Sequence, residues 1–427
     1  MRCLHSCVPI MKHSIRTAGT AWVATAVFYF YQYALRTAPS VMMPELAEGF
    51  ALTSFGVAAL LGVFYYGYSP FSLIAGVALD RLGARGVVPV GALLAATGAF
   101  LFGTSTVGAA QLGRFMQGAG GVFALVGAVY IATINFPASR AATLIGATQM
   151  FGMAGGSAGQ FLVGPIIAAG ISLRSFWFGM GVIGLFLAAL LYITIPVKVP
   201  LLQPDDAMKG TARSIGTVLR NPQSIICGLI AGLLFLPTTI LGMTWGVRFL
   251  QQAHGFDYGE AVIRSAALPV GWMIGCPLLG ALSDRLGRRK SVIAGGASVL
   301  FACVAWVLYG NAGFIPPYVV GIVMGIASGA AMLPYTVIKE SQPPQLGGTA
   351  TGVINFLIFT LSAVAGPVFA WAMQVITGAG QPAREHYQTT FRPLLYAVAV
   401  AMVLTLFLRE TGTANPQSKQ LAANASI

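Results

Sequence analysis

The ionisable side chains inside the long apolar segments of this sequence are arginines: Arg36, Arg114, Arg248 and Arg264. An ionisable residue is costly in a hydrocarbon environment, so each of the four is a candidate functional residue. The sequence predicts no Asp, Glu or His at the same depth. A low-dielectric cavity whose charges are all positive favours an anion. The chemistry expected from these residues is therefore anion binding.

Arg36 is the best placed of the four. Counted from Trp22 at about 1.5 Å per residue, it lies roughly 21 Å into an apolar layer about 30 Å thick. The guanidinium offers a planar fork for a carboxylate or phosphate. The alternative is a structural arginine held by neighbouring backbone carbonyls. At helical spacing its face also carries Tyr29, Gln32 and Tyr33.

Further polar residues are predicted to line the same cavity. Tyr65 lies well inside the second apolar segment, and Gln149 and Asn355 lie in later segments. Arg114 is a candidate for substrate contact, with support of helix packing as the alternative. For Arg264 the sequence predicts an ion pair with Glu260 near the outer surface, and Arg248 is also expected near the surface.

One charged stretch occurs twice, each time between two apolar segments. The copies read Gly76-Val-Ala-Leu-Asp80-Arg81-Leu-Gly83-Ala-Arg85-Gly86 and Gly280-Ala-Leu-Ser-Asp284-Arg285-Leu-Gly287-Arg288-Arg289-Lys290. Each predicts a tight hairpin, because glycine turns where a Cβ would clash. The Asp is expected to cap the helix that follows it. The basic residues favour the cytoplasmic side of a membrane.

The composition excludes a soluble globular protein. Hydrophobic residues make up 56% of the chain and charged residues 8%, and the mean hydropathy is +0.79. Such a surface must face lipid. The net charge of +13 comes mainly from short loops, which argues against a nucleic-acid partner. The five cysteines predict no disulfide framework, and Cys3 and Cys7 beside His5 are only a weak metal candidate. No metal site or cofactor is expected.

Segments of about 20 apolar residues, the length that spans a bilayer, predict about twelve helices. They begin near positions 21, 55, 87, 112, 143, 176, 224, 261, 291, 315, 348 and 393. Gly164-Pro165 and Gly366-Pro367 occupy corresponding places in two halves, which indicates an internal duplication. The predicted divisions are a cytoplasmic tail (1–20), a six-helix bundle (21–196), a cytoplasmic linker (197–221), a second six-helix bundle (222–409) and a cytoplasmic tail (410–427).

The repeated hairpin resembles the signature between helices 2 and 3, and between helices 8 and 9, of the major facilitator superfamily of secondary transporters. The resemblance implies an all-α integral membrane fold with two pseudo-symmetric halves. It also implies a cytoplasmic gate whose hairpins bind neighbouring helix ends when the cavity faces outward. The predicted gating residues are Asp80, Arg81, Gly83, Asp284, Arg285 and Gly287. The stretch Arg114-Phe-Met-Gln-Gly118 resembles the R-x-x-x-G motif of helix 4 in the same superfamily.

The stretch Arg36-Thr-Ala-Pro-Ser-Val-Met-Met-Pro44 is similar to helix 1 of the organophosphate:phosphate antiporters and related organic-anion permeases. That similarity implies that Arg36 binds the anionic group of the substrate. The second arginine of the antiporters has its counterpart at Ile240, so the two-arginine clamp is incomplete. A monocarboxylate, another weaker anion and an anionic chelate therefore stay open.

The sequence thus predicts a secondary transporter that moves a small anionic solute by alternating access. The alternatives are a permease for a metal ion or metal chelate and a solute sensor that signals without transport. No enzyme motif is apparent. The expected partners are the small solute and the bilayer, and the protein is expected to be monomeric. We expect a multi-pass protein of an inner or an internal membrane with both termini in the cytoplasm.

Overall fold

The computed structural model describes residues 15–52, 54–104, 106–137, 140–163, 166, 169–196, 209–311, 318–378 and 382–412, and this part of the chain is helical without strands. The possible metal ligands Cys3, His5 and Cys7 lie outside the described residues. So do Gly164-Pro165, residues 197–208 of the predicted linker and nearly all of the predicted C-terminal tail.

The helices of the first part of the chain are α1 (Ile15–Thr37), η1 (Ala38–Val41), α2 (Met43–Gly49), α3 (Ser54–Phe102), α4 (Val107–Asn135), α5 (Ala141–Phe161) and α7 (Leu173–Thr194). We call them the N-terminal helices. Helix α1 ends at Thr37, because Pro39 cannot continue the α-helical hydrogen bonding and the chain passes into the 3-10 turn η1. Arg36 consequently lies in the last turn of α1.

The helix α8 (Lys209–Arg220) lies within the predicted linker. It is followed by α9 (Pro222–Pro237), η4 (Thr238–Trp245), α10 (Gly246–His254), α11 (Tyr258–Leu286), α12 (Arg289–Tyr309), α13 (Val319–Ser328), η6 (Gly329–Met332), α14 (Leu333–Glu340), η7 (Pro344–Leu346), α15 (Gly347–Thr377) and α16 (Arg384–Phe407). We call α9 to α16 the C-terminal helices. The last helix begins well before Pro393, the predicted start, because a proline in the interior of α16 does not stop it.

Helix α3 contains two membrane passes joined at Gly83. That residue has φ 71° and ψ 167°, a conformation that favours glycine. A Cβ at Gly67 would lie 3.0 Å from Ala119 N, and one at Gly98 would lie 2.8 Å from Gln117 N. Both ends of α3 therefore contact the same part of α4, so the chain must fold back between them. The predicted hairpin is confirmed.

Nine helical segments among the described residues are long and apolar enough to cross a membrane. One of them, Ala59–Phe102, contains two passes. Helices α1 and α5 have 23 and 21 residues, which is also enough to span the apolar layer. The described residues therefore agree with the predicted all-α membrane fold of twelve passes. The boundaries of the predicted domains stay a prediction.

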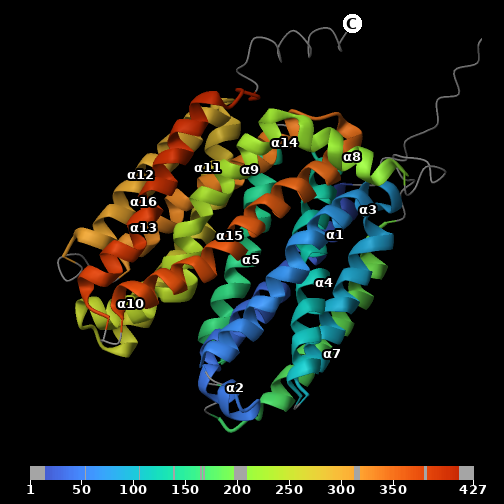
Figure 1. The fold of residues 1–427 in the computed structure, drawn as a ribbon. Helices are drawn as coiled ribbons and strands as arrows, with labels where there is room; N and C mark the ends of the chain where they lie inside the picture. Colours follow the sequence, from blue (N-terminus) through green and yellow to red (C-terminus); the bar gives the residue numbers. More distant parts are fainter. Residues whose placement is uncertain are drawn as a thin grey trace, which may run out of the picture.

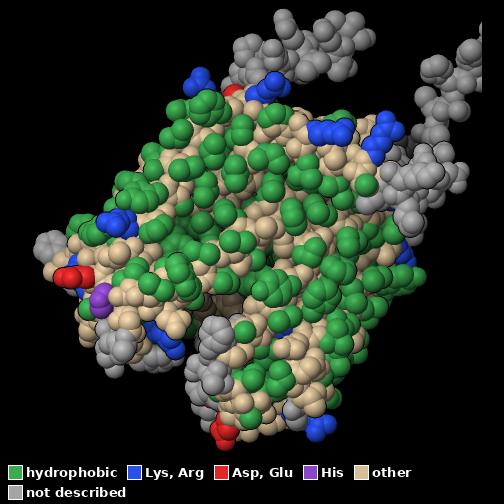
Figure 2. Space-filling view, in the orientation of Figure 1, with side chains coloured by type: hydrophobic (Ala, Val, Ile, Leu, Met, Phe, Trp, Pro, Cys, Tyr) green, Lys and Arg blue, Asp and Glu red, His purple; other side chains and the backbone are tan. Residues whose placement is uncertain are grey.

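The two groups of helices lie side by side, with α5, α11 and α15 between them (Figure 1). Helices α8 and α14 lie at one end of the molecule, the α14 end, and α2 and α10 lie at the other, the α2 end (Figure 1). Hydrophobic side chains cover most of the visible face, and charged side chains lie at its margins (Figure 2). Figure 2 also shows a hollow between the two groups that opens toward the α2 end.

The two groups approach each other closely through glycine. A Cβ at Gly76 of α3 would lie 2.5 Å from Gly348 O of α15. A Cβ at Gly280 of α11 would lie 2.6 Å from Ala142 O of α5. Both distances are too short for a real side chain, so glycine allows the helices to pack backbone to backbone. The repeated stretch of the sequence thus provides both contacts.

Candidate functional site

Arg36 is enclosed by aromatic side chains from three helices. The residue is only 7% exposed, and its Nη2 donates a hydrogen bond of 2.9 Å to Tyr65 Oη. The guanidinium carbon lies 5.0–5.1 Å from the ring centres of Tyr33, Tyr65 and Phe359. Its Nη1 has no hydrogen-bond partner among the described residues. A guanidinium edge is therefore available to an incoming acceptor.

Arg114 has a different set of contacts. Its Nη1 donates to Leu35 O at 3.0 Å and to Gln117 Oε1 at 2.7 Å, and its Nη2 lies 3.5 Å from Arg36 O. These carbonyls belong to the last turn of α1, where helix carbonyls lack partners within the helix. Arg114 thus holds the end of the helix that carries Arg36. The contacts fit the packing role that was the alternative for Arg114.

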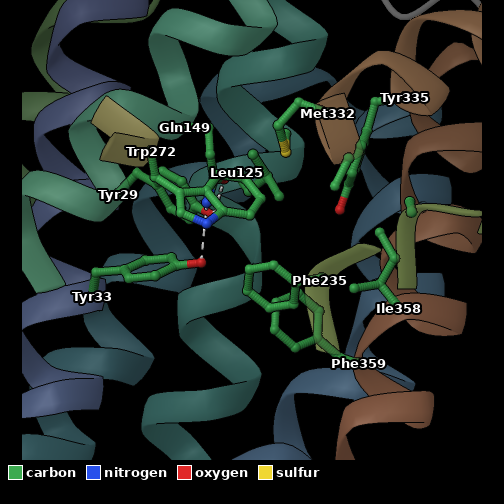
Figure 3. Close-up of a pocket in the computed structure, with 12 residues that line it drawn as sticks. Tyr29, Tyr33, Leu125, Gln149, Phe235, Trp272, Met332, Tyr335, Ile358 and Phe359 are labelled. Carbon is green, nitrogen blue, oxygen red and sulfur yellow. Dashed lines mark hydrogen bonds between the residues drawn. The ribbon is translucent and has the colours of Figure 1, made fainter. Parts of the chain in front are cut away.

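A small central pocket lies next to Arg36, between the two groups of helices. Tyr33 and Phe359 line the pocket and also contact Arg36. The described residues that line it carry no charge, and most are aromatic or aliphatic (Figure 3). They are Tyr29, Tyr33, Leu125, Gln149, Ala231, Phe235, Trp272, Ala331, Met332, Tyr335, Ile358 and Phe359. The lining is therefore mainly apolar, with polar atoms that include the tyrosine hydroxyls and the Gln149 amide.

Two hydrogen-bonded chains fix polar side chains around the pocket. On one wall Tyr29 Oη donates to Gln149 Oε1 at 2.9 Å, and Gln149 Nε2 donates to Tyr33 Oη at 3.3 Å (Figure 3). On the other wall Tyr335 Oη donates to Asn355 Oδ1 at 2.8 Å. Asn355 Nδ2 in turn donates to Ser72 Oγ of α3 at 3.0 Å. Asn355 therefore lies behind Tyr335 and joins the two groups of helices, outside the pocket lining.

The structure gathers most of the predicted binding residues but not all of them. Gln32 is fully buried and does not line the pocket. Its side chain packs against α4, where a Cβ at Gly121 would collide with it. Its amide atoms have no partner among the described residues. Arg264 forms the predicted ion pair with Glu260 at 2.7 Å, and Arg248 is exposed on α10. A direct role of Gln32 in binding stays a prediction.

Asp80 joins the hairpin of α3 to the start of α15. Its carboxylate accepts hydrogen bonds from Gly348 N at 2.8 Å, Thr349 N at 2.7 Å and Thr349 Oγ1 at 2.7 Å. The free N–H groups and the dipole of a helix start both favour a carboxylate. The expectation that Asp80 caps the helix following it is wrong. The chain continues from Asp80 through Gly83 without a free helix start there, so the cap serves a helix of the other group.

Asp284 makes the corresponding contact with α5. Its Oδ2 accepts from Thr143 N at 3.0 Å and from Thr143 Oγ1 at 2.9 Å. Its Oδ1 also lies 2.5 Å from Arg289 Nη1, and Arg289 Nη2 lies 2.9 Å from Glu340 Oε1. Here too the capped helix is one of the other group. At the α14 end, therefore, each hairpin binds across the boundary between the two groups.

The other predicted gating residues have distinct positions. Arg81 packs toward α8, since a Cβ at Gly210 would lie 2.5 Å from its Nη2. Gly83 breaks α3, and Gly287 ends α11 in a left-handed conformation with φ 60°. Arg285 is exposed. The ion pairs of the second hairpin are formed instead by Arg289, which the sequence places one helical turn further along.

Sequence reasoning missed several residues of the site. Phe359 contacts Arg36 and two tyrosines of α3, with ring centres 6.3 Å from Tyr65 and 4.5 Å from Tyr68. An aromatic residue in an apolar segment carries no signal of its own, because most such residues simply pack. Tyr335 was also missed. It lies in a predicted apolar segment, and the only local signal for it was its position one helical turn before Lys339. Among the described residues no three His, Cys, Asp or Glu side chains are placed to hold a metal.

Comparisons with known proteins agree with this architecture. A family model described as Major Facilitator Superfamily matches residues 25–367. The chain is 26% identical over 384 residues to a protein of Cupriavidus necator named "Probable sulfoacetate transporter SauU", covering 84% of this chain and 87% of that one. It is also 26% identical over 293 residues to an "MFS-type efflux pump" of Mycolicibacterium smegmatis, covering 65% of each chain.

Solved structures show the same fold. The E. coli fucose:proton symporter FucP superposes with a TM-score of 0.66 at 15% identity, covering 90% of this chain and 98% of that chain. The proton:xylose symporter XylE superposes with a TM-score of 0.70 at 14% identity, covering 94% and 98%. The match of the family model over most of the sequence, together with the paired hairpins and the helical fold, leads to one conclusion. This chain belongs to the Major Facilitator Superfamily.

Proposed function

We propose that this protein is a secondary transporter of a small organic anion and that Arg36 binds the anionic group. The observation that carries the proposal is the guanidinium of Arg36, which is enclosed at the side of the central pocket with its Nη1 unpartnered among the described residues. An uncompensated buried charge is costly. An anionic substrate would supply the missing counter-charge and the missing acceptor.

A purely structural role explains Arg36 less well. A structural arginine would be expected to use backbone carbonyls, as Arg114 does with Leu35 O. Arg36 instead donates to a tyrosine hydroxyl and is otherwise surrounded by ring faces. Rings attract a cation by about 0.5–2 kcal/mol each, which keeps the charge in place without satisfying its hydrogen bonds. The arrangement therefore favours a binding residue over a packing residue.

The relative from Cupriavidus necator, which aligns over most of both chains, carries the name of a sulfoacetate transporter and so supports a small organic anion. A sulfonate or a carboxylate offers planar or near-planar pairs of oxygens to a guanidinium. The aromatic walls of the pocket would contact the carbon atoms of a solute of that class once the pocket widens to admit it. The narrower resemblance to organophosphate antiporters stays a prediction.

Transport would proceed by alternating access. In this structure the helix groups are joined at the α14 end by Asp80 and Asp284, and a hollow opens toward the α2 end (Figure 2). With the predicted orientation, in which the hairpins face the cytoplasm, this is an outward-facing arrangement. Inward opening would break the bonds from Asp80 to α15 and from Asp284 to α5. The protein would act as a monomer in an inner or an internal membrane, with both termini in the cytoplasm.

The test is a thermal-shift screen of the purified protein against sulfoacetate, acetate, sulfate, glycerol 3-phosphate, a neutral hexose and a ferric chelate. A ligand at ~100 times its dissociation constant stabilises by about 2.7 kcal/mol. We expect a small organic anion to raise the melting temperature of the wild type. Arg36→Gln should lose the shift, and Arg36→Lys should retain part of it because the charge remains without the fork.

The matched control is Arg248→Gln, which removes an exposed arginine. It should respond to the anion as the wild type does. Equal stabilisation of Arg36→Gln and wild type would disprove the role of Arg36. Stabilisation of both by the ferric chelate, with no response to simple anions, would favour the chelate permease instead.

A further inference from the structure

Lys339 is a cation of the C-terminal helices that reaches across to the N-terminal helices. It lies in the last turn of α14 and is partly buried, and its Nζ donates a hydrogen bond to Thr133 Oγ1 of α4. Its stem packs beside the start of α15, because a Cβ at Gly347 would lie 3.4 Å from Lys339 Cε. This lysine has no part in the site around Arg36.

Lys339 continues a face that begins at the central pocket. Tyr335 lines the pocket, and Lys339 follows it by four residues, which places both on one face of α14. On the opposing helix Leu125 lines the pocket, and Thr133 lies about two turns further along α4. The contact between Lys339 and Thr133 therefore joins α14 to α4 between the pocket and the α14 end.

Among the described residues, the partners of the Lys339 ammonium belong to the N-terminal helices. Its hydrogen-bond partner is the neutral hydroxyl of Thr133, and none of the salt bridges among the described residues includes it. Asp80 attracts it electrostatically, but the Asp80 carboxylate is engaged by Gly348 and Thr349. Thr133 and Asp80 both belong to the N-terminal helices. Separation of the two groups at this end would remove both from Lys339.

We propose that Lys339 is a second binding position for the transported anion, reached from the cytoplasmic side and closed in this structure. The proposal rests on the proposed function. When α4 and α14 separate, the ammonium faces the open route with no counter-charge from its own group of helices. An ammonium is a compact point charge that accepts a carboxylate or a sulfonate without a fixed geometry. The anion would pass between Arg36 and Lys339 along the Tyr335 face.

The test compares half-saturating concentrations for the anion at the two membrane faces, using right-side-out and inside-out vesicles. Lys339→Gln should raise the value at the cytoplasmic face at least 10-fold, and Lys339→Arg should restore most of the affinity. Arg220→Gln is the charge control, since it removes an exposed cation of α8 at the same end of the molecule. It should leave both values unchanged.

Thr133→Val separates anion binding from closure of the gate. It removes the hydroxyl that holds Lys339 in the closed state but keeps the ammonium. We expect Thr133→Val to favour inward opening without loss of affinity at the cytoplasmic face. If Lys339→Gln and Thr133→Val change both faces alike, Lys339 is only a latch and the proposal is wrong.

The failures of the two proposals are distinguishable. If no anion binds the wild type at either face, the proposed function itself fails. If binding from outside depends on Arg36 while Lys339→Gln has wild-type affinity at the cytoplasmic face, only the second position fails. The outside measurement on Arg36→Gln is therefore made on the same vesicle preparation.

Discussion

At the scale of single residues, two neighbouring arginines have different hydrogen-bond acceptors, and the roles that we propose for them differ accordingly. Arg114 is bound to Leu35 O and Gln117 Oε1, so its position supports the end of α1. Arg36 is bound to one phenol hydroxyl and surrounded by rings. The carbonyl-bound arginine is fixed in one place, whereas the ring-bound arginine keeps donors for a ligand. The hydrogen bond to Tyr65 therefore sets the orientation of the Arg36 guanidinium.

Tyr65→Phe tests this positioning role. It keeps the ring against Arg36 but removes the hydroxyl that accepts from Nη2. A hydrogen bond to a charged group contributes about 1.5–3 kcal/mol, so we expect anion affinity to fall roughly 10-fold or more. Isothermal titration measures the change. Tyr66→Phe is the control, because Tyr66 is 63% exposed, and wild-type affinity in Tyr65→Phe would contradict the role.

At the scale of helices, the decisive feature is close packing between α3 and α15. Gly76 and Gly352 allow it, since a Cβ at Gly76 would lie 2.5 Å from Gly348 O and one at Gly352 would lie 3.1 Å from Gly76 Cα. The same approach brings Asp80 within hydrogen-bond distance of Gly348 N. The glycines and the carboxylate therefore act together, because the cap forms only when the helices touch.

Gly76→Ala should weaken closure at the α14 end. The added methyl must push α15 away and so lengthen the bonds to Asp80. We expect faster labelling of a Tyr335→Cys reporter by an impermeant maleimide added at the cytoplasmic face. The matched control is Gly62→Ala in the same helix. Its added Cβ has no atom within 4 Å, and the substitution raises helix propensity by the same amount. Equal labelling of both variants would refute the packing argument.

Local sequence signals predicted the helices and hairpins but not their partners. The glycine and aspartate of the first hairpin indicated a turn, and Gly83 forms it. Nothing local indicated that Asp80 would bind Gly348, because that contact joins segments far apart in the chain. Arg36 was identified by its cost inside an apolar segment, whereas Phe359 was missed because a buried phenylalanine is ordinary. Long-range contacts among apolar residues are what the sequence could not supply.

At the scale of the whole molecule, two carboxylates join the halves of a duplicated architecture. Asp80 caps α15 and Asp284 caps α5, so each group of helices holds the other by the start of one helix. The copies are not equivalent. Asp284 is also paired with Arg289, which in turn contacts Glu340, so the second hairpin carries a charge network in addition to its cap.

Asp80→Asn should favour the inward-facing state without abolishing binding. The amide can accept fewer of the three hydrogen bonds and has lost the charge that the helix start favours. A shift of about 10-fold in the conformational equilibrium, or about 1.4 kcal/mol, is expected. Transport would fall while the thermal shift with anion persists.

Asp284→Asn provides the comparison for Asp80→Asn. It should also favour inward opening, and it should lower the melting temperature further because Arg289 loses one of its two carboxylate partners. Loss of both transport and ligand-induced stabilisation in Asp80→Asn would indicate misfolding and contradict the gate assignment.

The uncharged lining of the central pocket also decides how the membrane potential acts on this protein. The described lining residues contribute no charge, so the charge beside the pocket comes from Arg36 and from the buried Arg114 bonded to the end of the same helix. A bound monovalent anion would cancel one of these two positive charges, so the loaded carrier would be less positive there than the empty carrier. A charge crossing the whole field exchanges about 2.3 kcal/mol per 100 mV. The membrane potential would therefore act more strongly on the movement of the empty carrier than on that of the loaded carrier.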